Sequence, residues 1–201
     1  MFGMMHWRIS LASSGAMEAT TAIAGHPGVM AMTNAGSTAG SATITPGAVA
    51  HGIFLTDGAI EYETLVKLSH VADGTVDFGV TIGFGDNTNS LTASDVALHF
   101  VYARATSTNW IIRAMKNGSA SSTTTDVAVT DEWVKLKIIT NAEGDLATFY
   151  IDGVSVGTKA TTTLPVLKIQ PRYTYKHAAG TNNRYLYIDY FNFTQTLATA
   201  R

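Results

Sequence analysis

Hydrophobic and polar residues alternate with a period of two along much of this chain. The clearest case is the segment 76–84, whose apolar residues fall on one face: Val76, Phe78, Val80, Ile82 and Phe84. Its other face carries only small or polar residues, and such alternation predicts a half-buried β-strand. The same pattern recurs in six further segments: Ile60–Leu68, Val96–Arg104, Asn109–Met115, Trp133–Thr140, Leu146–Ile151 and Tyr185–Phe193. No sustained helical stripe is visible, so the pattern predicts an all-β protein.

The segment Asp131–Gly157 is the most informative part of this pattern. It contains two predicted strands joined by a glycine-containing turn at 141–145, and a third strand that starts at Asp152-Gly153. An Asp-Gly pair suits a tight hairpin, because the turns that fit twisted strands need positive φ at their central residues. Short strands separated by such turns are typical of a two-sheet antiparallel β-sandwich or jelly roll.

Trp133 shares one face of its predicted strand with Lys135 and Lys137. Two arrangements are possible. The indole packs with the lysine stems at a sheet edge, or the alternate residues of the strand form the core face and Trp133 points outward. We interpret Trp133 as an interior or inter-subunit contact, and keep it as a candidate partner-binding residue.

Residues 12–50 are rich in Ala, Gly, Ser and Thr and carry no charge after Glu18. Such a composition is also found in flexible linkers. Small apolar anchors recur in it, however, so we predict an ordered arm laid over the sandwich. The chain is then a single domain over 1–201, with the arm and first strands in 1–50 and the sandwich core in 51–195.

Composition narrows the chemistry of the chain. It has no cysteine, which excludes disulfides, thiolate catalysis and cysteine-bound zinc. The net charge is −2 and 14% of residues are charged, so a nucleic-acid partner is not expected. The sequence contains no run of about 18 apolar residues, so no membrane span is predicted. At the N-terminus, Arg8 follows the apolar residues instead of preceding them, so no export signal is expected.

Several motifs together resemble the concanavalin A-like lectin/glucanase jelly roll over residues 25–195. The residues that carry the resemblance are Trp110, Asp131-Glu132-Trp133, Asn141 to Gly144, Phe149-Tyr150-Ile151-Asp152-Gly153 and Ile188-Asp189-Tyr190. His26-Pro27-Gly28 and Gly83-Phe84-Gly85-Asp86 look like the versions found in structural proteins of tailed bacteriophages. This resemblance implies a tail, fibre or capsid-decorating module.

Glu61 and Glu63 are the strongest catalytic candidates. Alternate strand residues lie about 6.6–6.8 Å apart and project to the same side, and a carboxylate pair can perform glycoside hydrolysis. The resemblance implies three alternating acidic residues in glucanases of this fold, but the third is missing here, where Thr64, Leu65 and Val66 follow. We therefore expect no enzymatic activity and no catalytic residue.

Asp86, Asn87, Asn89 and Asp95 offer oxygen ligands of the kind that calcium prefers. The segment fails the EF-hand pattern, because the sixth position from Asp86 lacks glycine. Asp and Asn are also common turn residues, so we expect turn chemistry here and no metal or other cofactor. The histidines show no ligand spacing.

The segment 170–187 is the predicted recognition surface. It combines aromatic rings with amide and guanidinium donors, which suit sugar hydroxyls and protein interfaces alike. Its candidate residues are Arg172, Tyr173, Tyr175, Asn182, Asn183 and Arg184. Alternatively, the tyrosines are simply amphipathic strand residues beside a long loop.

These observations predict a non-enzymatic virion protein of a tailed bacteriophage, assembled in the host cytoplasm. Its partners would be other virion proteins or copies of itself, and a host-surface glycan. The alternatives are a glycoside hydrolase that uses Glu61 and Glu63, and a bacterial lectin-like module. Fold alone does not decide among them.

Overall fold

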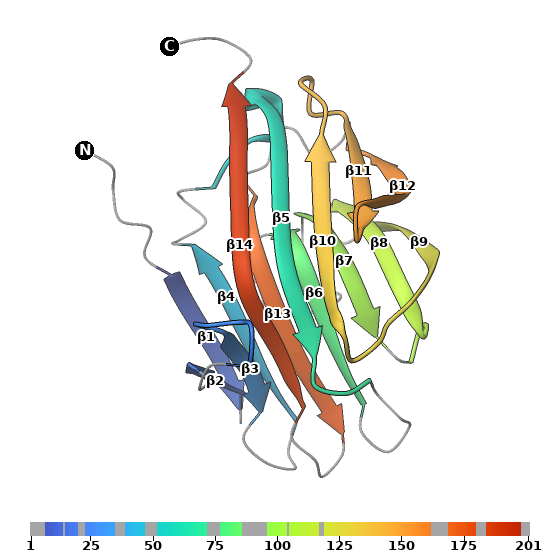
Figure 1. Cartoon of the computed structure of the whole chain (residues 1–201). Coiled ribbons are helices and arrows are strands. Elements are labelled where there is room, and N and C mark those ends of the chain that lie inside the picture. The colour runs from blue at the N-terminus through green and yellow to red at the C-terminus, as the bar shows by residue number, and fades with distance from the viewer. Residues whose placement is uncertain are drawn as a thin grey trace, which may run out of the picture.

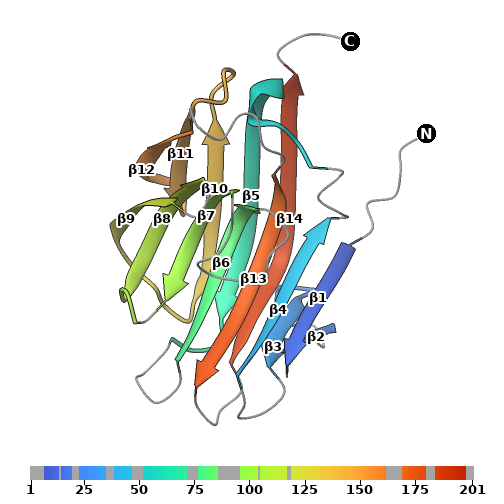
Figure 2. The same ribbon diagram turned by 180° about the vertical axis from the view of Figure 1, so that it is seen from behind.

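The computed structural model describes most of the chain. The residues described are 7–13, 15–19, 23–34, 39–46, 52–71, 77–85, 96–103, 105–116, 119–161, 169–179 and 184–197. They form two antiparallel sheets of seven strands each, which confirms the predicted β-sandwich. Figure 1 looks onto the second sheet and Figure 2 looks onto the first from the opposite side. Within this part of the chain, no helix is long and apolar enough to cross a membrane.

Strand order differs from sequence order in both sheets. The first sheet runs β1 (Trp7–Ser13), β4 (Gly40–Pro46), β13 (Gln170–Ala179), β6 (Asp77–Gly85), β7 (Val96–Ala103), β8 (Asn109–Lys116) and β9 (Ser119–Ala128). The second runs β12 (Val154–Ala160), β11 (Leu146–Ile151), β10 (Trp133–Thr140), β5 (Gly58–Leu68), β14 (Tyr185–Leu197), β3 (Met30–Asn34) and β2 (Gly15–Ala19). A short 3-10 helix, η2 (Leu55–Asp57), precedes β5.

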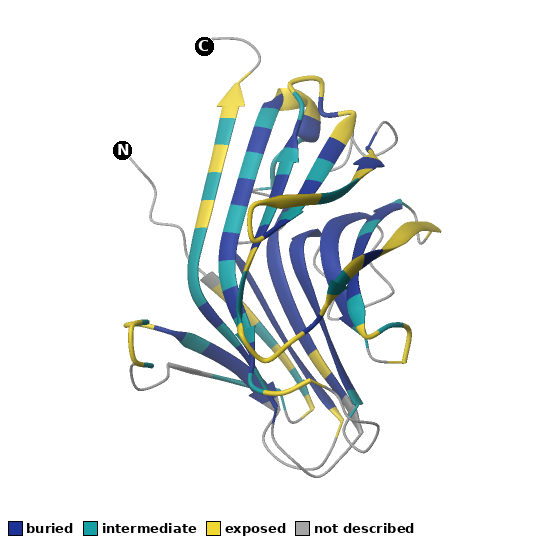
Figure 3. Cartoon of the chain, turned by 45° about the vertical axis from the view of Figure 1, so that its right-hand side comes forward, coloured by how far each residue is buried: buried dark blue, intermediate teal, exposed yellow. Residues whose placement is uncertain are grey.

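The core lies between the sheets, and the alternating pattern decides which side chains enter it. Along β5, buried and half-buried residues alternate without interruption, which appears as banding in Figure 3. On β10 the core face is formed by Val134, Leu136 and Ile138, so Trp133 points outward with the lysines. This is the second of the two arrangements predicted for that strand. Aromatic rings from opposite sheets meet in the core, as where the ring centroids of Phe100 and Phe149 lie 5.1 Å apart.

The strand at 77–85 departs from the expectation of a half-buried strand. In β6 nearly every residue is buried, including Thr81 on the face away from the second sheet. The small residues of that face leave room for long side chains of the neighbouring strand. The Arg172 guanidinium lies so close to Gly85 that a Cβ there would come within 3.1 Å of Nη1. The outer face of the first sheet is thus a packed layer at its centre.

The small-residue tract of 12–50 is ordered where the structure describes it, as predicted. It does not lie over the sandwich as an arm, however. It supplies β2 and β3 to the second sheet and β4 to the first, where β4 lies between β1 and β13. Small and β-branched residues fit this position because β4 is buried on both faces.

One hydrogen-bonded chain joins the two sheets through the core. Tyr173 on β13 donates its hydroxyl to Thr64 Oγ1 on β5 (2.7 Å), and Thr64 donates to the carbonyl oxygen of Tyr190 on β14 (2.7 Å). Burial raises the pKa of Tyr173 to about 12, so this hydroxyl stays protonated and keeps its donor role. The hydrogen bond from Thr64 to Tyr190 holds β14 just after its bulge at Asp189, where an extra residue shifts the register.

Candidate functional site

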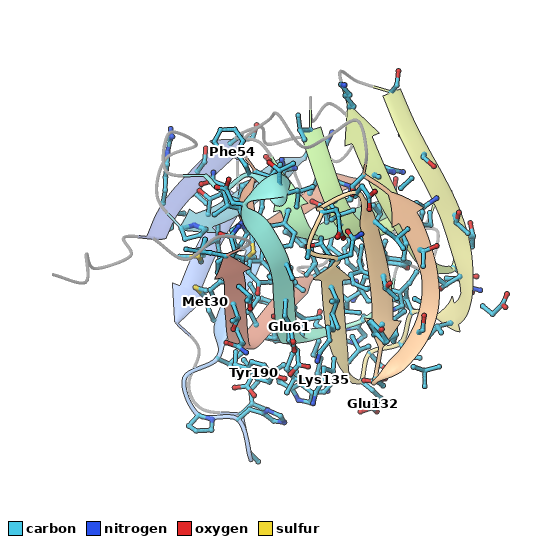
Figure 4. The ribbon with its side chains drawn as sticks, turned by 90° about the horizontal axis from the view of Figure 1, so that it is seen from above. Met30, Phe54, Glu61, Glu132, Lys135 and Tyr190 are labelled. Carbon is cyan, nitrogen blue, oxygen red and sulfur yellow. The ribbon has the colours of Figure 1, made fainter. Side chains whose placement is uncertain are left out.

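A groove of about 440 Å³ lies on the outer face of the second sheet, over β10 and β11. Its lining combines charged, aromatic and small residues: Glu63, Lys135, Lys137, Ile139, Tyr150, Asp152 and Gly153. Because alternate residues of a strand project to one side, the core pattern of β5, β10 and β11 automatically sends these residues outward. Figure 4 shows Glu61, Lys135 and Tyr190 together on this side of the sheet.

Strand register brings the charged residues of the groove into contact. Glu63 on β5 is opposite Lys137 on β10, and Lys137 is opposite Tyr150 on β11. The Lys137 ammonium lies 2.7 Å from Glu61 Oε1 and 3.2 Å from Glu63 Oε2, so one cation bridges both carboxylates. The hydroxyl of Tyr190 donates to Glu63 Oε1 at 2.7 Å. This network fixes the floor beside the groove.

The network also fixes the protonation of its members. The hydrogen bond from Tyr190, followed by that from Lys137, holds the pKa of Glu63 below its ordinary value. The hydrogen bond with Glu61, followed by that with Glu63, holds the pKa of Lys137 above its ordinary value. Glu63 and Lys137 are therefore charged at neutral pH, and the floor keeps its charges over the physiological range.

Three other polar groups line the groove without being used by this network. The Lys135 ammonium is 46% exposed and lies 3.9 Å from Glu63 Oε1, beyond hydrogen-bond distance. Neither this ammonium nor the Tyr150 hydroxyl makes a hydrogen bond with the part of the chain that the structure describes. Asp152 uses one carboxylate oxygen for the backbone N–H of Lys135 (2.8 Å). Its other oxygen is open to a ligand.

The Asp152-Gly153 turn places these groups beside one another. Asp152 has φ 49° and Gly153 has φ 83°, which confirms the predicted primed hairpin turn. The turn is bound to β10, because the N–H of Asp152 donates to the carbonyl oxygen of Lys135 at 2.9 Å. Asp152, at the tip of the hairpin, thereby lines one side of the groove.

An aromatic pair lies next to the groove on the same face. His26 stacks on Trp133 with ring centroids 4.2 Å apart, and His26 Nδ1 lies 2.8 Å from Asp189 Oδ2. Asp189 is the extra residue of the β14 bulge. Trp133, which the sequence suggests as an interior or inter-subunit contact, is half-buried under the segment that carries His26. Because Trp133 lies on the same face of β10 as Lys135, its ring is part of the outer surface next to the groove.

The recognition surface predicted within 170–187 is largely wrong. Arg172, Tyr173 and Tyr175 are buried, because β13 is a central strand of the first sheet with β4 and β6 on either side. The two tyrosines face the core, and Arg172 lies in the packed outer layer. Arg184 is also buried, and its carbonyl oxygen accepts a hydrogen bond from Thr33.

The remaining predicted residues have different outcomes. Asn182 and Asn183 lie outside the described residues, as do the calcium candidates Asp86, Asn87, Asn89 and Asp95. Within the described ranges, no group of three or more His, Cys, Asp or Glu side chains could hold a metal ion. Glu61 and Glu63, proposed as a pair from their spacing, do lie together at the groove.

Sequence reasoning missed Lys135, Tyr150, Asp152 and Tyr190 as members of one site. A usable signal exists for three of them. The turn at 141–145 sets Lys137 opposite Tyr150, and the short Asp-Gly turn brings Asp152 close to Lys135. The position of Tyr190 has no such signal, because the bulge at Asp189 decides which face it occupies.

Solved structures share this fold. The chain aligns with protein SO2946 of Shewanella oneidensis MR-1 over 97% of its length and 80% of that chain, with a TM-score of 0.66 and 13% identity. The Emp46p carbohydrate recognition domain aligns over 93% and 87% of the two chains, with a TM-score of 0.66 and 8% identity. At these identities the likeness concerns the fold.

The chain also aligns with botulinum neurotoxin type C, over 98% of its length, at a TM-score of 0.62 and 12% identity. The cell entry of that neurotoxin depends on its interaction with two ganglioside molecules. This chain spans a little under half of the neurotoxin chains that it matches, 44% in this case and 45% of a type DC binding domain. No curated protein sequence matches it.

Sequence comparison gives a closer relationship. The family described as SO2946-like, C-terminal domain, matches residues 25–189, which include the strands from β3 to β13 and every residue that lines the groove. The outer-face groove is therefore carried by the part of the chain that defines the family. This protein belongs to the SO2946-like C-terminal domain family.

Proposed function

We propose that this domain is a non-catalytic, lectin-like module that binds carbohydrate in the groove over β10 and β11. The observation that carries the proposal is a set of three polar groups around one recess that the network does not use: the Lys135 ammonium, the Tyr150 hydroxyl and the second carboxylate oxygen of Asp152. Ligand sites typically combine a preformed recess with a few convergent polar groups. Here the network around Lys137 holds the recess in shape before any ligand arrives.

The chemistry of these groups suits a sugar. The Tyr150 ring offers an apolar face together with a hydroxyl, and sugar rings likewise combine C–H faces with hydroxyl groups. The Lys135 ammonium donates hydrogen bonds and the Asp152 carboxylate accepts them, and bonds to charged groups are stronger than bonds between neutral groups. A sugar hydroxyl can serve both partners at once.

The structural neighbours support this proposal through their names. Emp46p and Emp47p contribute domains called carbohydrate recognition domains, and the cell entry of botulinum neurotoxin type C depends on two ganglioside molecules. These statements concern those proteins. The names of Emp46p and Emp47p support the use of a sandwich of this shape as a carbohydrate-binding scaffold.

The proposal that the domain is not an enzyme rests on the state of its acidic pair. A glycoside hydrolase needs one carboxylic acid that stays protonated to donate to the leaving group. Glu63 has a pKa below its ordinary value, and both Glu61 and Glu63 are held by the Lys137 ammonium. Glu63 is therefore not placed to act as the protonated acid at neutral pH, and Glu61 is engaged in the ion pair with Lys137.

Titration of the purified domain with a panel of oligosaccharides by NMR or calorimetry tests the function. We expect saturable binding that Tyr150→Ala weakens by about tenfold, the loss expected from removing one aromatic contact. Lys176→Ala, an exposed position on the first sheet, is the control and should leave affinity unchanged. Binding that survives Tyr150→Ala would place the ligand elsewhere. New reducing ends that disappear in Glu63→Gln would instead identify a hydrolase.

We further propose that the module works in a virion of a tailed bacteriophage, as an oligomer among head, tail or fibre proteins. The support is the likeness of two short motifs, and both have structural roles. His26 of the first motif binds Asp189 and covers Trp133, and Gly85 of the second leaves room for Arg172. Co-purification with phage particles, and sedimentation as a trimer, are the expected results. A monomer absent from particles would contradict this placement.

A further inference from the structure

We infer that the groove selects a neutral glycan, and that Asp152 is the residue that disfavours acidic sugars. This inference rests on the carbohydrate-binding function proposed above and names the class of sugar. It follows from the signs and positions of the charges in the groove, which the alternation of the strands alone does not reveal.

The charges that line the groove are balanced. Lys135 and Lys137 contribute two ammonium groups, and Glu63 and Asp152 contribute two carboxylates. Just beyond the lining, Glu61 adds a third carboxylate on the same Lys137 ammonium. An incoming anion would therefore meet more negative than positive charge from these groups. Of the two lysines that line the groove, Lys137 bridges carboxylates at hydrogen-bond distance and Lys135 does not.

The two groups that would decide between charged ligands are neighbours of opposite sign. Asp152 is bound to the backbone of Lys135 through its Oδ1 atom, yet no ion pair within 4.0 Å joins the two side chains among the residues described. A neutral hydroxyl group can accept from the ammonium and donate to the carboxylate. A carboxylate or sulfate on the ligand can use only the ammonium, and it is repelled by Asp152 and Glu63.

The two carboxylates that line the groove, Glu63 and Asp152, are both fixed in place. Glu63 is held ionised by the bonds from Tyr190 and Lys137. Its repulsion of an acidic ligand is therefore not relieved by protonation of Glu63 near neutral pH. Asp152 is the exposed member of the pair and is fixed by the turn geometry. Asp152 is not a member of the network around Lys137, so its charge can be removed without disturbing that network.

Asp152→Asn is a conservative test, because asparagine also favours positive φ in an Asx-Gly turn and keeps an oxygen for the Lys135 N–H. The probes are matched pairs that differ in charge: lactose with sialyllactose, and galactose oligomers with galacturonate oligomers. For the wild type we expect the neutral member to bind at least tenfold more tightly. In Asp152→Asn this ratio should fall by about tenfold, through stronger binding of the acidic member.

Asp145→Asn is the control, because it removes one charge at the other end of β11. The Asp145 side chain accepts from Asn141 Nδ2 in its own turn and is not part of the groove lining. It should leave the ratio unchanged. Raising the salt concentration from 50 to 500 mM should have little effect on neutral sugars and should narrow the ratio in the wild type, because screening weakens repulsion between exposed charges.

The outcomes separate this inference from the proposed function. If acidic sugars bind the wild type more tightly, and Tyr150→Ala abolishes that binding, the selectivity inference is wrong and the carbohydrate function stands. An unchanged ratio in Asp152→Asn also overturns the role of Asp152. If no member of either class binds, the proposed function itself fails.

Discussion

At the scale of single residues, Tyr190 connects the core to the surface. Its backbone carbonyl accepts from Thr64, which itself accepts from Tyr173 in the core, and its hydroxyl donates to Glu63 on the outer face. Burial, followed by the bond to Glu63, raises the pKa of Tyr190 above its ordinary value. The tyrosine therefore remains a donor, and Glu63 remains an acceptor.

Replacing Tyr190 with phenylalanine should raise the pKa of Glu63 toward its ordinary value, because the Tyr190 hydrogen bond is the largest cause of the lowering. A carboxylate with a lowered pKa contributes stability above its unfolded pKa of about 4.3, and this stability is lost as pH falls through the lowered value. Tyr190→Phe should lose part of it at neutral pH.

Carbon-detected NMR titration of the Glu63 carboxyl measures this shift. Tyr187→Phe is a suitable control, since Tyr187 lies on the same strand and stacks on Tyr185. An unchanged Glu63 pKa in Tyr190→Phe would show that the lysines alone set it.

At the scale of elements, the two turns that join β10 to β11 and β11 to β12 position the residues of the groove. Asn141 organises the first, where its side-chain oxygen accepts from the N–H groups of Asp145 and Leu146 at 3.0 Å each. Gly144 and Gly153 both have positive φ, at 68° and 83°. Their surroundings differ. A Cβ on Gly144 would overlap the carbonyl of Leu55 in η2, while nothing lies within 4 Å of a Cβ on Gly153.

Alanine substitution at these two glycines should therefore separate backbone strain from packing. Gly153→Ala should cost about 1 kcal/mol, the price of a left-handed non-glycine residue. Gly144→Ala should cost about 1–3 kcal/mol more, because η2 must move as well. Urea unfolding of both variants gives the two free energies. Equal losses would mean that η2 yields without cost.

Element-scale pairing also explains why the tyrosines of 170–187 divide into two classes. Tyr173 and Tyr175 belong to β13, a strand with neighbours on both sides and buried on both faces, whereas Tyr185 and Tyr187 belong to β14 and project outward from the second sheet. Their composition is the same. The difference comes from the face on which each pair lies, because Tyr173 and Tyr175 face the core between the sheets and Tyr185 and Tyr187 lie on the outer face of β14. Local sequence does not encode this choice.

At the scale of the whole molecule, the centre of the first sheet is buried on its outer face as well. A row of paired residues crosses it from Arg172 through Gly83 and His99 to Arg113. His99 is 2% exposed, and its Nε2 atom has no hydrogen-bond partner among the residues that the structure describes. Burial, followed by the charges of Arg172 and Arg113, holds the pKa of His99 well below its ordinary value.

This buried imidazole should make the protein sensitive to mild acid. Below about pH 6.5 the unfolded chain binds a proton at His99 while the folded chain does not, so stability falls as pH decreases, by up to about 1.4 kcal/mol per pH unit. His99→Leu should flatten the dependence of Tm on pH between 7 and 5. His70→Gln, at an exposed position, should leave the slope unchanged. An equal slope in His99→Leu would assign the acid sensitivity to other groups.

The sequence alone determined the class of fold and much of its local detail. Alternation identified β5, β6, β7, β8, β10, β11 and β14 because the face of each strand that meets the core carries the larger apolar residues, which leaves a period of two in the sequence. The Asp152-Gly153 turn was predictable because few residue pairs accept positive φ twice. The spacing of Glu61 and Glu63 placed them on one face for the same geometric reason.

Only the tertiary structure decided which of these faces forms a site. β4 and β13 also alternate between apolar or aromatic and polar residues, but most of their polar residues are buried as well, so nothing local marks them as central strands. Tyr173 and Tyr175 therefore look like surface residues until their sheet is known. The groove needs the register among β5, β10 and β11 and the bulge that turns Tyr190 outward. These are contacts between segments up to 127 residues apart. Periodicity within one strand carries no information about such pairings, because every strand with one buried face has the same period.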